Sequence, residues 1–257
     1  MSARHGSRVV VVGAAGALGR AACAALAARG HAVWAADAAD PSPALAGLPG
    51  GGHHAVRVDV TEQTSVDELL RTAWEGPDAR LDGLVYAPGV NVTGPVADLD
   101  WPGYERLMDV NLNGAFRTGQ ALARMLATDA RPFGSVFLSS TAGLRGEAGG
   151  AAYSASKFGL IGFVQSFAAE IAGYGGRANA VCPGNVDSPM LRRLAAQVAE
   201  RESAPAEEVL ARFADASAFR RLIDPGEVGR VCAWLVSAES SGISGQNLVV
   251  DGPPPAG

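Results

Sequence analysis

Short apolar runs alternate along the chain with longer stretches in which apolar residues recur every three or four positions. The short runs are typical of strands buried on both faces, and the longer stretches are typical of amphipathic helices. The pattern predicts strands at Arg8–Val12, His31–Ala36, Ala55–Val60, Leu81–Tyr86, Ser135–Ser139, Ala178–Cys182 and Asn247–Val250. It predicts helices at Arg20–Arg29, Ser65–Trp74, Tyr104–Ala127, Ala152–Ala172 and Glu227–Ser237.

This alternation indicates parallel βαβ units, because parallel strands need a crossover connection that is usually a helix. We therefore expect an α/β fold of the Rossmann type, with a doubly wound parallel sheet of about seven strands. A single domain is expected to cover residues 1–257. Ligands of such sheets bind beyond the carboxyl ends of the strands, so the turns that follow the strands are the expected functional segments.

Composition narrows the function classes. A hydrophobic content of 48% is enough for a large core, and the net charge of −5 without a basic stripe argues against nucleic-acid binding. No apolar stretch approaches the roughly 20 residues of a membrane span. Cys23, Cys182 and Cys232 lie far apart without a CxxC spacing, so we expect reduced thiols in a cytoplasmic protein. The pair His53 and His54 lies in a glycine-rich stretch without further ligands, so no metal site is expected.

Three glycines, Gly13, Gly16 and Gly19, stand between the first predicted strand and the first predicted helix. Glycine lets the backbone approach a diphosphate, and a helix N-terminus supplies N–H donors and a positive dipole end. We therefore expect this turn to bind the diphosphate of a dinucleotide cofactor. The residues expected at that contact are Gly13, Ala15, Gly16, Ala17, Leu18 and Gly19.

An acidic residue, Asp37, follows the second predicted strand at the distance expected of a carboxylate that binds the adenosine ribose 2′-OH. A carboxylate there repels a 2′-phosphate, and its neighbours Ala36 and Ala38 are not arginine. The sequence therefore favours NAD(H) over NADP(H). Asp59 and Val60, at the end of the third predicted strand, are candidates for the adenine pocket, although Asp59 can equally be a simple helix approach.

Tyr153 and Lys157 are four residues apart in a predicted helix, which places both side chains on one face. Lys157 is the single lysine among 21 Lys and Arg side chains, so charge alone does not explain it. Lysine is a compact ammonium on a flexible stem, whereas arginine is a planar fork. The ammonium can stabilise a phenolate. The alternative is an incidental surface pair.

These residues, together with Asn111, the Ser139-Ser140 pair, Pro183-Gly184 and the closing Gly245–Gly252 segment, resemble the short-chain dehydrogenase/reductase family over essentially the full length. The resemblance implies a single Rossmann domain with a seven-stranded parallel sheet. It also implies assembly as a homotetramer or homodimer and a small-molecule hydroxy or keto substrate.

The resemblance also assigns roles. Tyr153 is expected to be the general acid/base, and Lys157 to lower its pKa and hold the nicotinamide ribose. Bringing a tyrosine pKa from about 10 to neutrality takes about 4 kcal/mol, expected from Lys157 and an oxidised nicotinamide. Ser140, preferred over Ser139 for its spacing from Tyr153, is expected to bind the substrate oxygen. Asn111 is expected to complete a proton relay through water and Lys157.

Further cofactor contacts follow from the same resemblance. The loop after the fourth strand is implied at the cofactor, and the segment from Pro183 is implied to close over the nicotinamide carboxamide. The residues concerned are Ala87, Pro88, Gly89, Pro183, Gly184, Val186 and Ser188. The chain departs from the family pattern in three places. Val12 replaces a threonine, Ala17 replaces the middle glycine, and Tyr86-Ala87-Pro88-Gly89 replaces Asn-Asn-Ala-Gly.

A long connection, Leu191–Leu222, is a candidate substrate lid within residues 190–222, with a helical pattern over Ala204–Leu222. Its arginines are either ligands of an anionic substrate or a solvated face: Arg192, Arg193, Arg220 and Arg221. Arg145, five residues past Ser140, either faces the mouth of the pocket or pairs with Glu147.

The function expected from these residues is NAD(H)-dependent interconversion of a secondary alcohol and a ketone by hydride transfer. One alternative is the reduction of carrier-bound β-ketoacyl groups, although an acidic chain is poorly suited to an acidic carrier. Another is a regulatory domain that senses NAD(H) without turnover, but such a domain is expected to have lost members of the Asn-Ser-Tyr-Lys set.

Overall fold

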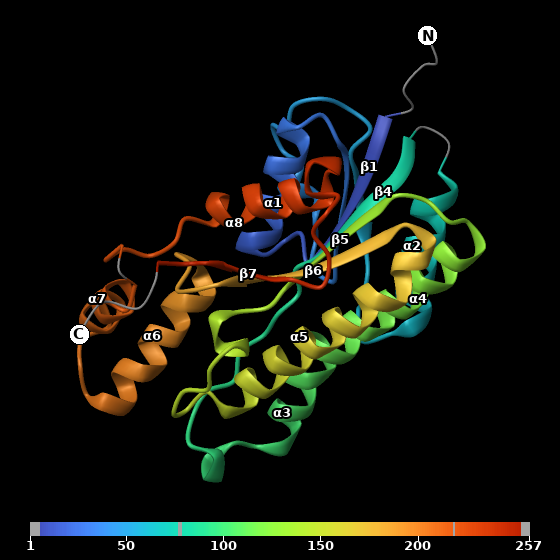
Figure 1. Cartoon of the computed structure of the whole chain (residues 1–257). Helices are drawn as coiled ribbons and strands as arrows, with labels where there is room; N and C mark the ends of the chain where they lie inside the picture. The colour runs from blue at the N-terminus through green and yellow to red at the C-terminus, as the bar shows by residue number, and fades with distance from the viewer. Residues whose placement is uncertain (1–5, 77–78, 218, 253–257) are drawn as a thin grey trace.

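The computed structural model describes residues 6–76, 79–217 and 219–252 (Figure 1). Seven strands form one sheet, in the order β3-β2-β1-β4-β5-β6-β7, and every pairing is parallel. The strands are β1 (Gly6–Val12), β2 (Ala32–Asp37), β3 (His54–Arg57), β4 (Ala79–Tyr86), β5 (Phe133–Leu138), β6 (Gly176–Pro183) and β7 (Asn247–Val250). The single-domain α/β fold with a seven-stranded parallel sheet is thereby confirmed.

Helices cover both faces of this sheet (Figure 1). The helices α2 (Gln63–Glu75), α4 (Gly114–Thr128) and α5 (Ala151–Ile171) pack on one face, and α1 (Ala17–Ala28) and α8 (Pro225–Val236) pack on the other. The alternation of side chains along a strand produces this division. In β1, Val10 and Val12 contribute to the core beneath α2, α4 and α5, whereas Val9 and Val11 contribute to the core beneath α1 and α8.

The strand order reverses between β1 and β4. From β1 the chain first extends the sheet through β2 and β3, and then crosses back to β4 on the other side of β1. The connections at this point leave in opposite directions, which opens a crevice beyond the carboxyl ends of the two strands. The turns after Val12, Asp37, Tyr86 and Leu138 therefore meet at one edge of the sheet.

The third predicted strand and the helix predicted from Tyr104 are wrong in their extent. The third strand ends at Arg57 rather than Val60, because its neighbour β2 ends at Asp37, the residue paired with Arg57. The long helix predicted at Tyr104–Ala127 is three segments: α3 (Trp101–Met108), a π-helix (Asp109–Asn113) and α4. The π-helix is centred on Asn111, a residue already singled out for chemistry.

The candidate lid contains two helices, α6 (Pro189–Glu202) and α7 (Ala206–Asp215), which project from the body of the molecule (Figure 1). The helix predicted over Ala204–Leu222 ends at Asp215, and α6 was not predicted. The two helices share a small apolar cluster of Ala195, Ala199 and Val209. They are therefore a packed unit of their own, connected to the sheet through β6 and α8.

Short 3₁₀ turns complete the chain at Ser42–Ala44, Val96–Asp98, Thr141–Gly143, Ala172–Tyr174 and Ala238–Ser240. The three cysteines are buried and free. Within the described residues, no helix is long and apolar enough to cross a bilayer.

Candidate active site

A cavity of about 1800 Å³ lies beyond the carboxyl ends of the strands. Its wall includes every residue expected at the cofactor: Gly13, Ala15, Gly16, Ala17, Leu18, Gly19, Asp37, Asp59, Val60, Ala87, Pro88, Gly89, Tyr153, Lys157, Pro183, Gly184, Val186 and Ser188. Ser140 also lines it, whereas Asn111 is fully buried behind the wall. The structure thus brings residues from several separate segments to one site.

The glycine turn fits a diphosphate. Gly13 has a φ of +78°, and a Cβ on it would lie 2.6 Å from the nitrogen of Pro88, so a side chain is excluded there. A Cβ on Gly19 would lie 2.1 Å from the carbonyl oxygen of Gly13. Gly16 differs, because a Cβ there would meet only that carbonyl oxygen, at 3.4 Å, and would otherwise occupy open space. Helix α1 then begins at Ala17 without a side-chain cap, so its N-terminus faces the cavity as an anion site.

Asp37 is fixed at the other end of this turn. Its Oδ2 accepts a hydrogen bond from the N–H of Ala15 at 2.9 Å, and its Oδ1 accepts one from the N–H of Ala39 at 2.9 Å. Arg57, its register partner in β3, lies outside the cavity wall and donates from Nη1 to the carbonyl oxygen of Ala38 at 2.7 Å. At the end of β2, the charged side chain in the cavity wall is therefore the carboxylate of Asp37.

Asp59 lies two residues beyond β3, in a turn rather than in the strand. Its carboxylate accepts hydrogen bonds from the N–H and the hydroxyl of Thr61, and these bonds hold its pKa below the usual value. Asp59 is thus an anionic turn residue in the cavity wall, and Val60 beside it is buried.

Lys157 is buried, with only 3% of its surface exposed, and its Nζ donates to the carbonyl oxygen of Leu138 at 2.8 Å. The same Nζ lies 5.6 Å from the centroid of the Tyr153 ring. Gly89 lies beside the ammonium, and a Cβ on it would be in ordinary van der Waals contact with Nζ at 3.7 Å. Burial lowers the pKa of Lys157 to about 8, because the charged form loses its hydration.

The expected fall in the pKa of Tyr153 depends on Lys157 and an oxidised nicotinamide together, and the protein alone does not produce it. Burial raises the pKa to about 12, and the hydrogen bond with Ser140 offsets only part of that rise. Desolvation disfavours the phenolate by more than the hydrogen bond from Ser140 favours it. The protein by itself therefore holds Tyr153 as a neutral phenol, the form suited to donate a proton to a substrate oxygen.

The two adjacent serines have different surroundings. Ser139 is buried, and its hydroxyl donates to the carbonyl oxygen of Lys157 at 3.1 Å, which ties α5 to the end of β5. Ser140 is half-buried in the cavity wall, where its Oγ accepts from the N–H of Ala142 at 3.2 Å. The Ser140 hydroxyl, also hydrogen-bonded to Tyr153, is the one of the two that faces the site.

Asn111 is a buried clamp. Its Oδ1 accepts from the N–H of Val90 at 2.8 Å, and its Nδ2 donates to the carbonyl of Val90 at 3.0 Å and to the hydroxyl of Ser156 at 3.1 Å. These bonds tie the loop after β4 to α5. They also supply the hydrogen bonding of a loop in which Pro88 has no N–H to donate.

Tyr86 is a functional candidate that sequence reasoning did not single out. It is fully buried at the end of β4, and its hydroxyl donates to the carbonyl oxygen of Val110 at 2.6 Å, inside the π-helix. A π-helix leaves the ordinary helical hydrogen-bond pattern, and such segments occur frequently at functional sites. Tyr86 stands where the family that the sequence resembles has asparagine, and this departure was the signal that could have singled out Tyr86 from the sequence.

We expect Tyr86→Phe to lower kcat about tenfold, because one buried hydrogen bond of about 1–1.5 kcal/mol holds the segment that carries Asn111. Cofactor affinity should stay within about twofold of wild type. Thr118→Val is the matched control, since it removes a buried hydroxyl that donates to the carbonyl of Gly114 in α4. Steady-state kinetics and urea unfolding of both variants separate the effects. Equal losses of kcat in the two variants would assign Tyr86 to stability alone.

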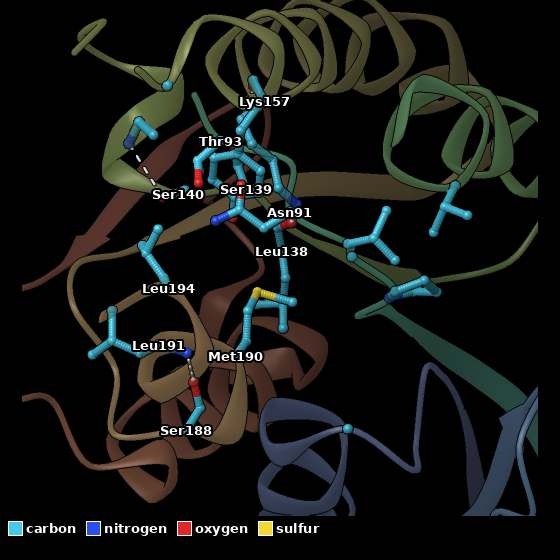
Figure 2. Close-up of a pocket in the computed structure, with 18 of the residues that line it drawn as sticks. Asn91, Thr93, Leu138, Ser139, Ser140, Lys157, Ser188, Met190, Leu191 and Leu194 are labelled. Carbon is cyan, nitrogen blue, oxygen red and sulfur yellow. Dashed lines mark hydrogen bonds between the residues drawn. The ribbon is translucent and has the colours of Figure 1, made fainter. Parts of the chain in front are cut away.

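The lid contributes the other side of the cavity. Ser188 accepts a hydrogen bond from the N–H of Leu191 and caps α6, while Met190, Leu191 and Leu194 form an apolar part of the wall (Figure 2). The N-terminal Ser188-Pro189 pair is the signal from which α6 was predictable, because an N-cap serine followed by proline favours a helix start.

Most of the arginines considered for an anionic substrate are engaged elsewhere. Arg192 forms an ion pair with Asp187, and Arg221 forms one with Glu227. Arg145 lies 3.6 Å from Glu147. Of the four lid arginines considered from the sequence, Arg193 is in the cavity wall, and Arg201 of α6 is there as well.

The fold defines a class, the single-domain α/β proteins with a doubly wound parallel sheet. Comparison with known proteins makes this more specific. A family model described as enoyl-(acyl carrier protein) reductase matches residues 13–252. The chain belongs to the short-chain dehydrogenase/reductase family and is an oxidoreductase of that family.

Three relatives illustrate the range of the family. Oxidoreductase UcpA of Salmonella typhimurium is 34% identical over 255 residues, covering 96% of this chain and 94% of the relative. Meso-2,3-butanediol dehydrogenase of Serratia marcescens is 31% identical over 249 residues, covering 95% and 92%. The crystal structure of a single-residue variant of actinorhodin polyketide ketoreductase with NADPH superposes with a TM-score of 0.90 at 26% identity, covering 98% of each chain.

Proposed function

We propose that the protein is an NAD(H)-dependent oxidoreductase that interconverts a secondary alcohol and a ketone. The observation that carries the proposal is the convergence of Ser140, Tyr153 and Lys157 at one end of a cavity whose other end holds Asp37. The bound nicotinamide supplies hydride transfer. The similarity to a butanediol dehydrogenase and to a ketoreductase supports this reaction class.

The roles of the side chains follow from their surroundings. Tyr153 is a buried neutral phenol and gives its proton to the carbonyl oxygen in reduction, or takes the proton of the alcohol in oxidation. Ser140 donates a hydrogen bond to the same oxygen and stabilises the charge that develops there. Lys157 stabilises the phenolate when it forms and binds the nicotinamide ribose. Asn111 holds the loop beside Lys157 and connects it to water.

The cofactor end is proposed to prefer NAD(H). A carboxylate at Asp37 accepts hydrogen bonds from a ribose 2′-OH and repels a 2′-phosphate. The ketoreductase of similar fold binds NADPH, so preference within the family has to be argued from the residue at this position.

Asp37→Ala should raise the Kd for NADH about tenfold and lower the Kd for NADPH, because it removes a charge-assisted hydrogen bond and a repulsive charge together. Fluorescence titration with both nucleotides measures the change. Asp40→Ala, which removes an exposed carboxylate three residues on, is the control and should alter neither Kd. A wild-type preference for NADPH would contradict the assignment.

The proposal also covers the lid, the oligomeric state and the location of the protein. The helices α6 and α7 close over the substrate, with Ser188 at the nicotinamide carboxamide. The protein assembles as a homotetramer or homodimer. In that assembly a second copy of the chain covers the exposed side chains of Phe116 in α4 and Phe158 in α5. The protein acts on a small molecule in the cytoplasm, without a nucleic-acid or membrane partner.

A carrier-bound β-ketoacyl group is the second candidate substrate, favoured by the likeness to a polyketide ketoreductase. A panel of secondary alcohols, ketones and a β-ketoacyl thioester, assayed with NAD(H) and NADP(H) by absorbance of the reduced nicotinamide, tests both. Turnover of free alcohols or ketones with NAD(H) is the expected result. Turnover of the thioester alone supports the second candidate. Tight NADH binding without any turnover would contradict the proposal that the protein is an enzyme.

A further inference from the structure

Three residues that line the cavity carry unpaired side-chain oxygens. Asn91 Oδ1, Thr93 Oγ1 and Ser154 Oγ are covered from solvent, and none has a hydrogen-bond partner within the described part of the chain. All three residues line the cavity. A covered and unpaired oxygen costs about 1–3 kcal/mol, and most buried polar groups in proteins are paired. Three of them in the wall of one ligand cavity indicate that a ligand completes their hydrogen bonding.

The backbone of this wall is held in place. Asn111 binds both the N–H and the carbonyl of Val90, next to the first of the three residues. The N–H of Gly94 donates to the carbonyl of Gly149 at 2.9 Å, which ties the loop after β4 to the segment that precedes Tyr153. The unpaired oxygens therefore stand on a fixed support, as a preorganised binding site requires.

The lid adds a third tie. Arg201, near the end of α6, donates from Nη1 to the carbonyl oxygen of Thr93 at 3.3 Å. Figure 2 shows Thr93 and Asn91 among the residues drawn around the cavity with Ser140 and Lys157.

The chemistry of these groups selects the ligand. The Asn91 oxygen only accepts, whereas the hydroxyls of Thr93 and Ser154 both donate and accept. A ligand hydroxyl satisfies both kinds of partner. A carboxylate only accepts and leaves the Asn91 oxygen unpaired. Glu147 and Glu202, also in the wall, form ion pairs with Arg145 and Arg212, so neither charge decides between a neutral ligand and an anion.

Resting on the proposed function, we infer that Asn91, Thr93 and Ser154 form a subsite for a second hydroxyl of the substrate. The substrate is then a neutral vicinal diol in the oxidation direction and an α-hydroxyketone in the reduction direction. The reacting carbon lies at Tyr153 and Ser140, and the neighbouring hydroxyl lies at the subsite. A ketone without that hydroxyl leaves the oxygens unpaired and is rejected.

The test compares three ketones of one chain length with NADH: 3-hydroxy-2-butanone, 2-butanone and the anion 3-oxobutanoate. We expect the hydroxyketone to have the highest kcat/KM, by roughly 100-fold over 2-butanone. Thr93→Val, which exchanges the hydroxyl for a methyl, should lower kcat/KM for the hydroxyketone about tenfold and leave that for 2-butanone unchanged. The comparison of kcat/KM among the three ketones tests the substrate class, and the Thr93→Val variant tests the contribution of the Thr93 hydroxyl.

Thr61→Val is the matched control, because Thr61 lines the same cavity but its hydroxyl is paired with Asp59. Both substrates share the cofactor, so this control should not change their ratio. Equal kcat/KM for hydroxyketone and ketone, preference for 3-oxobutanoate, or equal losses on both ketones in Thr93→Val would each overturn the subsite.

A binding measurement separates this inference from the proposed function. In the complex of Tyr153→Phe with NADH, calorimetry should detect the hydroxyketone more tightly bound than 2-butanone by roughly tenfold, whether or not wild type turns over. Turnover without this preference rejects the subsite and keeps the oxidoreductase. Preference without turnover of any ketone keeps the subsite and rejects the reaction.

Discussion

Lys157→Arg should lower kcat by at least about 10³, although the positive charge is kept. The ammonium is buried and donates to the carbonyl of Leu138. A planar guanidinium is larger and cannot occupy the same position with the same donor direction. Steady-state kinetics at saturating cofactor measures the loss. Near-normal kcat in this variant would refute a specific role for the only lysine of the chain.

The companion variant Lys157→Met should be inactive but more stable at neutral pH. Burial lowers the folded-state pKa of Lys157 from 10.5 to about 8, so the unfolded state binds more protons between these values. Stability attributable to this group therefore rises with pH across that window and is lowest below it. Removing the amine should raise the free energy of unfolding by about 1–3 kcal/mol at neutral pH, less the lost bond to Leu138.

Urea unfolding at about pH 7 and about pH 10 measures the effect. The stability advantage of Lys157→Met should shrink at the higher pH, because both folded and unfolded wild type approach the neutral amine there. An advantage that is independent of pH would show that packing, rather than the buried charge, distinguishes the variant. A loss of stability at both values would contradict the burial cost.

Tyr153→Phe should lower kcat by about 10²–10⁴ and leave the Kd for NADH within about twofold of wild type. The substitution removes the one proton that the buried phenol holds, while the ring and the helix remain. Tyr104→Phe is the matched control, because Tyr104 lines the same cavity and packs on Trp101. Turnover should survive in the control. Wild-type kcat in Tyr153→Phe would assign proton transfer to another group.

The raised pKa of Tyr153 also determines how kcat for ketone reduction varies with pH. Because burial holds the pKa of Tyr153 near 12, the phenol stays protonated over the whole neutral range in the protein itself. Proton donation to a ketone is then available at neutral pH, and any activation of the phenolate for oxidation has to come with the charge of the bound cofactor.

The sheet and the glycine turn could be predicted from sequence because their signals are local. A buried β-branched run, three glycines and a following helix lie within about twenty residues, and each demands the same structure. Asp37 was predictable because it lies at the end of a predicted strand. Tyr153 and Lys157 were predictable because their spacing of four residues within one helix places both side chains on the same face.

The π-helix at Asn111 could not be predicted from periodicity. The apolar pattern continues across Tyr104–Ala127, and the break in the helix is stabilised by contacts from distant segments, namely Tyr86 and Val90. The high pKa of Tyr153 has the same kind of origin, because it depends on how much of the ring the surrounding loops cover. Asn91 and Thr93 belong to no motif, and only the cavity shows that their oxygens share a wall.

The most direct test of the central claim follows the hydride. Secondary alcohols and vicinal diols deuterated at the carbinol carbon are incubated with the protein and NAD⁺, and the reduced cofactor is analysed by mass spectrometry. We predict NADH that carries the deuterium, with the diol as the better donor and no label transfer in Tyr153→Phe. Unlabelled NADH, or no reduced cofactor with any member of the set, would contradict hydride transfer from a secondary alcohol.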